Sequence, residues 1–266
     1  MRLQELFETT EEDRALASLS SAIYTKLQEF QYGVDEYNES NETYNVGKIG
    51  DIFDTSIPSL DNINIKIQSD DGIFKRVKMH NLDVKRDPYK EFISGAWDAS
   101  EDAIIFNEDH LNSNNMKTVV THELRHALDD IKSDYKAGES KKYFPASNKY
   151  KYSGEPENTP VIPAKDYSNQ GGEVNARFAE VLHAATMSIR RAYALPPDQI
   201  KAKIMQDLRK NFAITHIADS FPQKEKSPQY KRLMSRALDF ITKEMQYHES
   251  LLAQQGRPKH ATGSFN

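Results

Sequence analysis

The segment 118-TVVTHELRHALDD-130 constrains the fold more than any other part of the chain. On an α-helix, residues four positions apart lie only about 40° from each other around the axis. His122 and His126 would therefore project from one face, one turn apart. Apolar residues recur on the opposite face, namely Val120, Leu124, Ala127, Leu128 and Ile131. We predict an amphipathic helix that buries its apolar face in a core and lines a cleft with its two histidines.

Two imidazoles that converge on one point are typical of a zinc site. The chain contains no cysteine, which excludes thiolate ligands, disulfides and a cysteine nucleophile. Glu123 lies about 100° around the helix from His122, where its carboxylate can take a proton from water without binding the metal. The spacing predicts one catalytic zinc ion bound by His122 and His126, with Glu123 as general base. The alternative is a charged helix with two solvated histidines.

A zinc ion needs at least one more protein ligand, and the segment 172-GEVNARFAEVLHAA-185 offers it. Helical spacing places Glu173, Arg177 and Glu180 on one face of a second helix. Either glutamate can supply the carboxylate ligand. His183 is less suitable, because it lies one turn beyond Glu180 and towards the apolar side of the helix.

Two acids follow the second histidine, although acids near the C-terminal end of a helix oppose its dipole. We therefore expect Asp129 or Asp130 to have a partner, either by orienting His126 or by pairing with Arg177. The reaction also needs a group that stabilises the oxyanion. The possible donors are Arg177 and four tyrosines of the long connection 134–171, namely Tyr143, Tyr150, Tyr152 and Tyr167.

The hydrophobic period changes along the chain and predicts an α+β fold. Helical spacing with an N-cap at Thr10 and a stop at Gly33 predicts an N-terminal helix, followed by a polar loop over 34–45. Alternating apolar residues then predict short strands, listed as 63–67, 73–79 and two strands within 92–107 around an Asp/Ser/Glu turn. We expect a small, mainly antiparallel sheet, with Trp97 in its core or on its face.

Four helices are expected after the sheet. Capping and proline signals predict these ranges, in chain order: Asn114 or Asn115 to Ser133, 172–193, a helix opened by Pro196-Pro197, and a helix from Ser227-Pro228 to about Gly256. The connection 134–171 is long enough to be functional or mobile. Its part 141-KKYFPASNKYKY-152 is better interpreted as a solvated loop or a lid than as a nucleic-acid site.

THELRHALDD followed by EVNARFAE resembles the zincin metallopeptidases, and specifically the gluzincins of the compact kind found in bacteria and phages. The likeness covers roughly residues 90–195. It implies a zincin-like sheet packed on the HExxH helix, zinc ligands at His122, His126 and Glu173, and a general base at Glu123. It also implies that part of 92–107 is an edge strand that binds extended peptides. No third histidine follows His126 at the metzincin spacing, which argues against the metzincin type.

We expect an N-terminal helical segment over 1–45, a metallopeptidase domain over 46–195 and a C-terminal helical region over 196–266, with a flexible tail at 257–266. The resemblance does not explain residues 1–60 and 196–266, whose helices are expected from the capping and spacing signals alone. The expected substrate is a peptide or protein. The rival hypothesis is a catalytically inactive zincin-like protein that serves as a structural or partner-binding part of a phage assembly. A cell-wall amidase is a third hypothesis, because the same chemistry attacks any amide.

The remaining expectations concern partners and location. A net charge of −5 argues against general binding of nucleic acid. The first 17 residues lack the apolar core of a signal peptide, and no run reaches the 18 apolar residues of a membrane span. We expect a cytoplasmic or virion-associated protein. The sequence does not indicate an oligomeric state.

Overall fold

The computed structural model describes residues 3–31, 43–69, 94–113, 115–132, 171–211 and 226–254, together with Ile214, Ile217 and Ala218. The chain divides into two compact units. One unit comprises residues 18–176, and the other comprises residues 1–17 and 177–266. These limits fall inside two helices, α1 (Leu3–Gln31) and α6 (Gly171–Ala192). The domain limits expected at 45/46 and 195/196 remain predictions.

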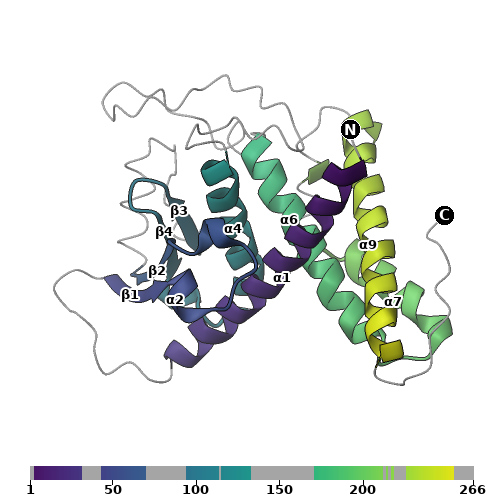
Figure 1. Ribbon diagram of the computed structural model, residues 1–266, viewed down its shortest axis with the longest axis horizontal. Helices are drawn as coiled ribbons and strands as arrows, with labels where there is room; N and C mark the ends of the chain where they lie inside the picture. The colour runs from purple at the N-terminus through teal and green to yellow at the C-terminus, as the bar shows by residue number, and fades with distance from the viewer. Residues whose placement is uncertain are drawn as a thin grey trace. The chain divides into compact units, whose positions relative to one another are not determined.

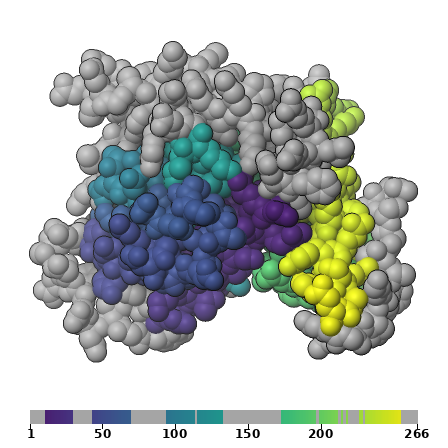
Figure 2. All heavy atoms as spheres, viewed as in Figure 1, coloured from purple at the N-terminus to yellow at the C-terminus, as the bar shows by residue number. Residues whose placement is uncertain are grey.

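The 18–176 unit contains a four-stranded sheet in the order β1-β2-β4-β3. The strands are β1 (Thr43–Lys48), β2 (Asn64–Gln68), β3 (Gly95–Asp98) and β4 (Ala103–Asn107). β1 pairs antiparallel with β2, β3 pairs antiparallel with β4, and the central pair β2–β4 is parallel. Two of the three pairings are thus antiparallel, as expected, and the parallel central pair makes the sheet mixed. Figure 2 shows the segment 43–69, coloured blue, as one continuous area of surface.

Two of the expected strand regions are confirmed. Ile65 and Ile67 are buried on β2. The turn between β3 and β4 is closed by Asp98, whose carboxylate accepts hydrogen bonds from the Ser100 backbone N–H at 3.0 Å and the Ser100 hydroxyl at 2.6 Å. The strand predicted at 73–79 and the connection 134–170 lie outside the described residues, as does the tail 257–266.

β1 begins inside the segment that was expected to be a loop. Its residues are mostly polar, and the pairing with β2 shifts register between Asn45 and Gly47. Gly47 has a φ of +127°, a conformation that costs a glycine little and other residues much. A bulge of this kind breaks the period-two pattern by which a strand is recognised in a sequence.

The helix α4 (Met116–Lys132) carries the HELRH segment and packs on β3 and β4 (Figure 1). Its buried apolar residues include Val120, Leu124, Ala127 and Leu128. They form most of the stripe that the sequence predicted, and they lie on the face opposite the histidines. The described part of this unit also contains α1 from residue 18 onward, the first residues of α6 and three short helices, namely α2 (Ile49–Ile52), η1 (Pro58–Leu60) and η2 (Glu108–His110).

The close packing of β3 on α4 depends on a glycine. A Cβ atom added to Gly95 would lie 2.7 Å from Val119 Cγ1 and 3.3 Å from Glu123 Cγ. The first distance is shorter than real Cβ contacts, so a side chain at this position would push the strand and the helix apart. Gly95 thus brings the sheet edge against the residue expected to be the general base.

The other unit is helical in its described parts. It holds the start of α1, most of α6, α7 (Pro197–Arg209) and α9 (Pro228–Gln254). The prolines predicted to open the last two helices do so. Arg14 of α1 pairs with Glu244 of α9 at 2.7 Å, and the Ser188 hydroxyl of α6 donates to Asp207 of α7 at 2.7 Å.

The N-terminal helix α1 is longer than expected, because it begins at Leu3 and not at Thr10. The preceding stretch LQELFE is made mostly of good helix formers, which extend the helix before the expected cap. None of the helices in the described ranges combines the length and the apolar character needed to cross a lipid bilayer.

Candidate metal centre

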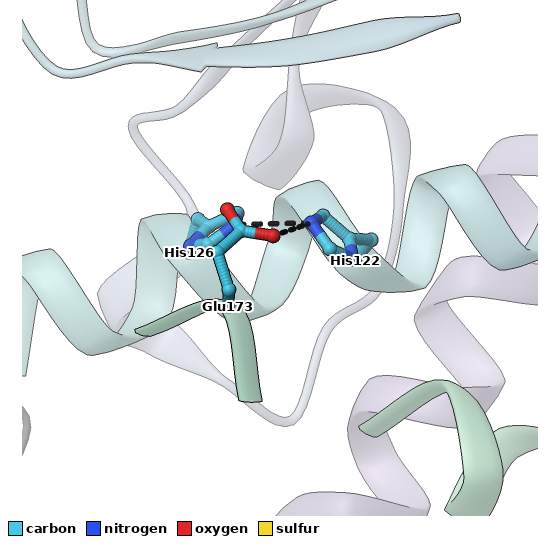
Figure 3. Close-up of side chains that lie close together, drawn as sticks. All are labelled: His122, His126 and Glu173. Carbon is cyan, nitrogen blue, oxygen red and sulfur yellow. Dashed lines mark hydrogen bonds and ion pairs between the residues drawn. The ribbon is translucent and has the colours of Figure 1, made fainter. Parts of the chain in front are cut away.

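Three side chains of the 18–176 unit converge on one point. His122 and His126 stand on adjacent turns of α4, and Glu173 reaches them from the first turn of α6 (Figure 3). The Nε2 atoms of the two imidazoles are 3.0 Å apart. Oε2 of Glu173 lies 3.4 Å from Nε2 of His122, and Oε1 lies 3.1 Å from Nε2 of His126. This buried group can hold a metal ion.

The closest contacts between these three groups are of the size found in a zinc site. Ligand atoms that bind zinc at about 2.0–2.1 Å in tetrahedral geometry lie roughly 3.3 Å from each other. The two nitrogens are 3.0 Å apart, and each nitrogen lies 3.1 or 3.4 Å from the carboxylate oxygen nearer to it. Two imidazole nitrogens that face each other so closely need a proton or a cation between them, because two lone pairs repel. The donor set therefore suits a cation that accepts both nitrogen and oxygen ligands.

The charges of the group depend on protonation. Burial by itself would raise the pKa of Glu173, but His126 and His122 outweigh it and hold the pKa well below the ordinary value. Burial by itself would lower the pKa of His126, but the carboxylate of Glu173 outweighs it and raises that pKa. Without a metal, the Glu173 carboxylate thus favours a proton on an imidazole. A metal ion held by this group would compete with that proton for the same nitrogen.

Glu123 lies next to the converging group in the sequence but does not belong to it. It follows His122 on α4, is buried, and is absent from the converging group. Burial raises the pKa of its carboxyl group, and the neighbouring His122 and His126 together with the backbone N–H of Trp97 counteract only part of that rise. A carboxylate with a raised pKa is better able to take a proton from water near neutral pH.

The two acids after His126 each have a partner that we did not predict. Asp129 pairs with Arg125 one turn earlier on α4, with Oδ1 2.8 Å from Nη2. Its other oxygen accepts a hydrogen bond from Nδ2 of Asn175, on the first part of α6, at 3.3 Å. Asp130 accepts a hydrogen bond of 2.7 Å from the indole N–H of Trp97 on β3. The only sequence signal for these partners was the unfavourable position of two acids near a helix C-terminus.

The other candidate residues lie elsewhere. Glu180 is two helical turns beyond Glu173 on α6 and is not part of the converging group. Arg177 is one turn beyond Glu173 and half-buried, and His183 is buried on the same helix. The tyrosines considered as oxyanion donors, Tyr167 among them, lie outside the described residues.

Comparison of the chain with models of protein families, with curated proteins and with solved structures finds no match. The geometry of the site itself is therefore the basis for a chemical interpretation.

Proposed function

We propose that this protein is a zinc-dependent hydrolase of peptide bonds, with His122, His126 and Glu173 as ligands of one zinc ion. One observation carries the proposal: two imidazole nitrogens and a buried carboxylate converge with separations of 3.0–3.4 Å, beside a buried glutamate that is not a ligand. Two histidines, one carboxylate and one open position form a common catalytic zinc site. The α+β fold, with a sheet packed on the HExxH helix, supports a zincin-like relationship.

Each residue has a definite task in this reaction. Zinc, when bound, supplies a Lewis acid that polarises the scissile carbonyl and makes water more acidic. Glu123 accepts the proton of the attacking water on its carboxylate and can deliver it to the leaving amine. The two histidine side chains are 17% and 19% exposed and the Glu173 side chain is 4% exposed, so a substrate would approach from the histidine side.

The edge strand is the proposed position of the substrate backbone. β3 is the last strand of the described sheet on the side of α4, and it pairs with β4 alone among the described strands. An extended peptide can add to such an edge through backbone hydrogen bonds. This would place a peptide bond beside Glu123, because β3 packs directly on that part of α4.

Metal analysis tests the ligand set. We expect close to one zinc ion per chain in the wild type and a large loss in His122→Ala and Glu173→Gln. Glu180→Gln is the matched control, because it removes a carboxylate from the same helix two turns away. Retention of zinc by Glu173→Gln together with loss from Glu180→Gln would transfer the ligand role to Glu180. A wild type that binds no zinc would rule out the proposal.

Activity is tested with Glu123→Gln, which keeps the size of the side chain but cannot accept a proton. Removal of a general base costs roughly 100- to 10,000-fold in rate. We expect zinc to remain bound while cleavage of a denatured protein substrate falls by about that factor. Cleavage that survives the change would exclude Glu123 as the base. Zinc binding without any cleavage by the wild type would favour the structural or partner-binding rival, including a role in a phage assembly.

A further inference from the structure

The proposed third ligand, Glu173, lies on a different helix from the two histidines, so its position must be fixed by contacts between helices. His122 and His126 are held together by consecutive turns of α4. Glu173 comes from another helix, 47 residues after His126 in the sequence. Its carboxylate meets the imidazoles only if the first turn of α6 is fixed against α4. Other contacts between α4 and the first turn of α6 therefore decide whether Glu173 reaches the imidazoles.

A chain of polar contacts joins the two helices directly beside the ligands. Arg125, one residue before His126, pairs with Asp129 at 2.8 Å within α4. The second oxygen of Asp129 accepts a hydrogen bond from Asn175, two residues after Glu173. All three side chains are buried, with relative exposures of 1% for Arg125, 7% for Asp129 and 1% for Asn175.

Each carboxylate oxygen of Asp129 contacts a different helix. The carboxylate of Asp129 uses one oxygen for its own helix and the other for α6, so Arg125 orients it and leaves the second oxygen available to Asn175. Burying an amide and a carboxylate is costly unless they are paired, so the hydrogen bond is strongly preferred once α6 docks. A shift of α6 along α4 would break it and move Glu173 by the same amount.

We propose that Asn175 and Asp129 are positioning residues that set the third metal ligand: Arg125 orients Asp129, Asp129 holds Asn175, and Asn175 fixes the start of α6 so that Glu173 reaches both imidazoles. This assignment rests on the proposed zinc site. It goes beyond it in giving a function to three polar residues that bind no metal. Partners that orient metal ligands typically contribute 10- to 100-fold to metal affinity.

A double-mutant cycle on zinc affinity tests the assignment. Asn175→Leu removes the amide with little change in shape, and zinc affinity is measured by competition with a chelating dye. We expect the affinity to fall about 10-fold or more in the wild-type background. In the Glu173→Gln background we expect no further fall, since the ligand that Asn175 positions is already gone. Asn175→Ser serves the same purpose if Asn175→Leu does not fold, as judged by circular dichroism.

Thr186→Val is the matched control, because Thr186 is also a buried polar residue of α6 and donates a 3.1 Å hydrogen bond to the carbonyl of Leu182 in the same helix. We expect it to leave zinc affinity unchanged. An equal loss of affinity from Asn175→Leu in both backgrounds would show a general structural role and overturn the assignment, as would no loss in the wild type. Absence of zinc from the wild type would instead overturn the proposed function on which the assignment depends.

Discussion

Two glutamates of this protein are equally buried, but their basic partners differ. One partner is always charged, and the others are charged only when protonated. Glu173 and Glu244 each expose 3% of their surface. Glu244 meets the guanidinium of Arg14 at 2.7 Å, a group that keeps its positive charge at every accessible pH. Glu173 meets two imidazoles, which are positive only when they bind a proton. The first pair is neutral as it stands, whereas the second group carries one negative charge until it binds a proton or a metal ion.

The difference separates an ion pair with fixed charges from a group whose charge depends on what it binds. A carboxylate beside an arginine has no reason to exchange its partner. A carboxylate beside two imidazoles accepts a proton or a metal ion in the same place, and its charge follows what it binds. α4 contributes to both kinds of group. It carries the Arg125–Asp129 ion pair, and Arg125 is the residue directly before His126. The structural pairs and the ligand group should therefore respond differently to the same treatments.

The largest effect is expected from Arg125→Met. This change keeps much of the packing volume but leaves the carboxylate of Asp129 buried without its cation. Breaking a buried pair by removing one partner costs about 3–5 kcal/mol. Urea denaturation of the metal-free protein measures the loss. Lys26→Met is the control, because the Lys26–Glu29 pair is 46% and 61% exposed and contributes little. An equal loss of unfolding free energy in Arg125→Met and Lys26→Met would contradict the expected difference between buried and exposed ion pairs.

A smaller effect is expected from Arg14→Met. The Arg14 side chain is 21% exposed, so water can replace part of what Glu244 loses. The change also removes the contact of the guanidinium with the ring of Tyr247, 3.9 Å from its centroid. We expect a loss of about 1–3 kcal/mol in the free energy of unfolding, and no change in zinc affinity. A large fall in zinc affinity would mean that the two buried glutamates are not independent.

The smallest effect concerns pH. The pKa of His126 is raised above its ordinary 6.5, so the stability it contributes is present below pH 6.5 and is lost as the pH rises through the raised value. The pKa of Glu173 is lowered below 4.5, so its contribution is lost as the pH falls beneath 4.5. With zinc removed, this group should stabilise the protein most between these limits and lose part of that stability towards pH 9.

Unfolding midpoints measured with a chelator present, from pH 5 to pH 9, test this expectation. Glu173→Gln should flatten the alkaline loss, because the carboxylate that raises the pKa of His126 is gone. Zinc should flatten it as well, by replacing the proton. A wild-type profile that stays unchanged after Glu173→Gln would mean that the alkaline loss arises elsewhere in the chain.

Features set by neighbouring residues were predictable from the sequence, and features set by distant pairing were not. The spacing of His122 and His126 determines their shared face, and the prolines at 197 and 228 determine where two helices begin. The parallel pairing of β2 with β4 depends on segments about 40 residues apart and has no local signal. Both Glu173 and Glu180 fitted a ligand role in the sequence, because spacing within one helix does not indicate which of them meets the two histidines. In the structure the converging group contains Glu173.

Buried polar contacts were the hardest part to foresee. Arg125 lies within the HELRH motif, where helical spacing alone suggests a solvated side chain, yet it is among the largest fully buried residues. Its burial becomes understandable only with Asp129 one turn away and Asn175 on another helix. The conflict between two acids and the helix dipole indicated that partners were needed, but it did not indicate which ones.

The glycine at position 95 gives the proposed site a rigidity that no side chain could provide. Because a methyl group there would come within 2.7 Å of Val119, strand and helix meet through backbone on one side of the contact. A contact of this kind has no rotamers on the strand side, so it neither costs side-chain entropy on folding nor averages over alternative conformations. The spacing between Glu123 and the sheet edge thus depends on the absence of a side chain at Gly95, and no side-chain repacking at that position can change it.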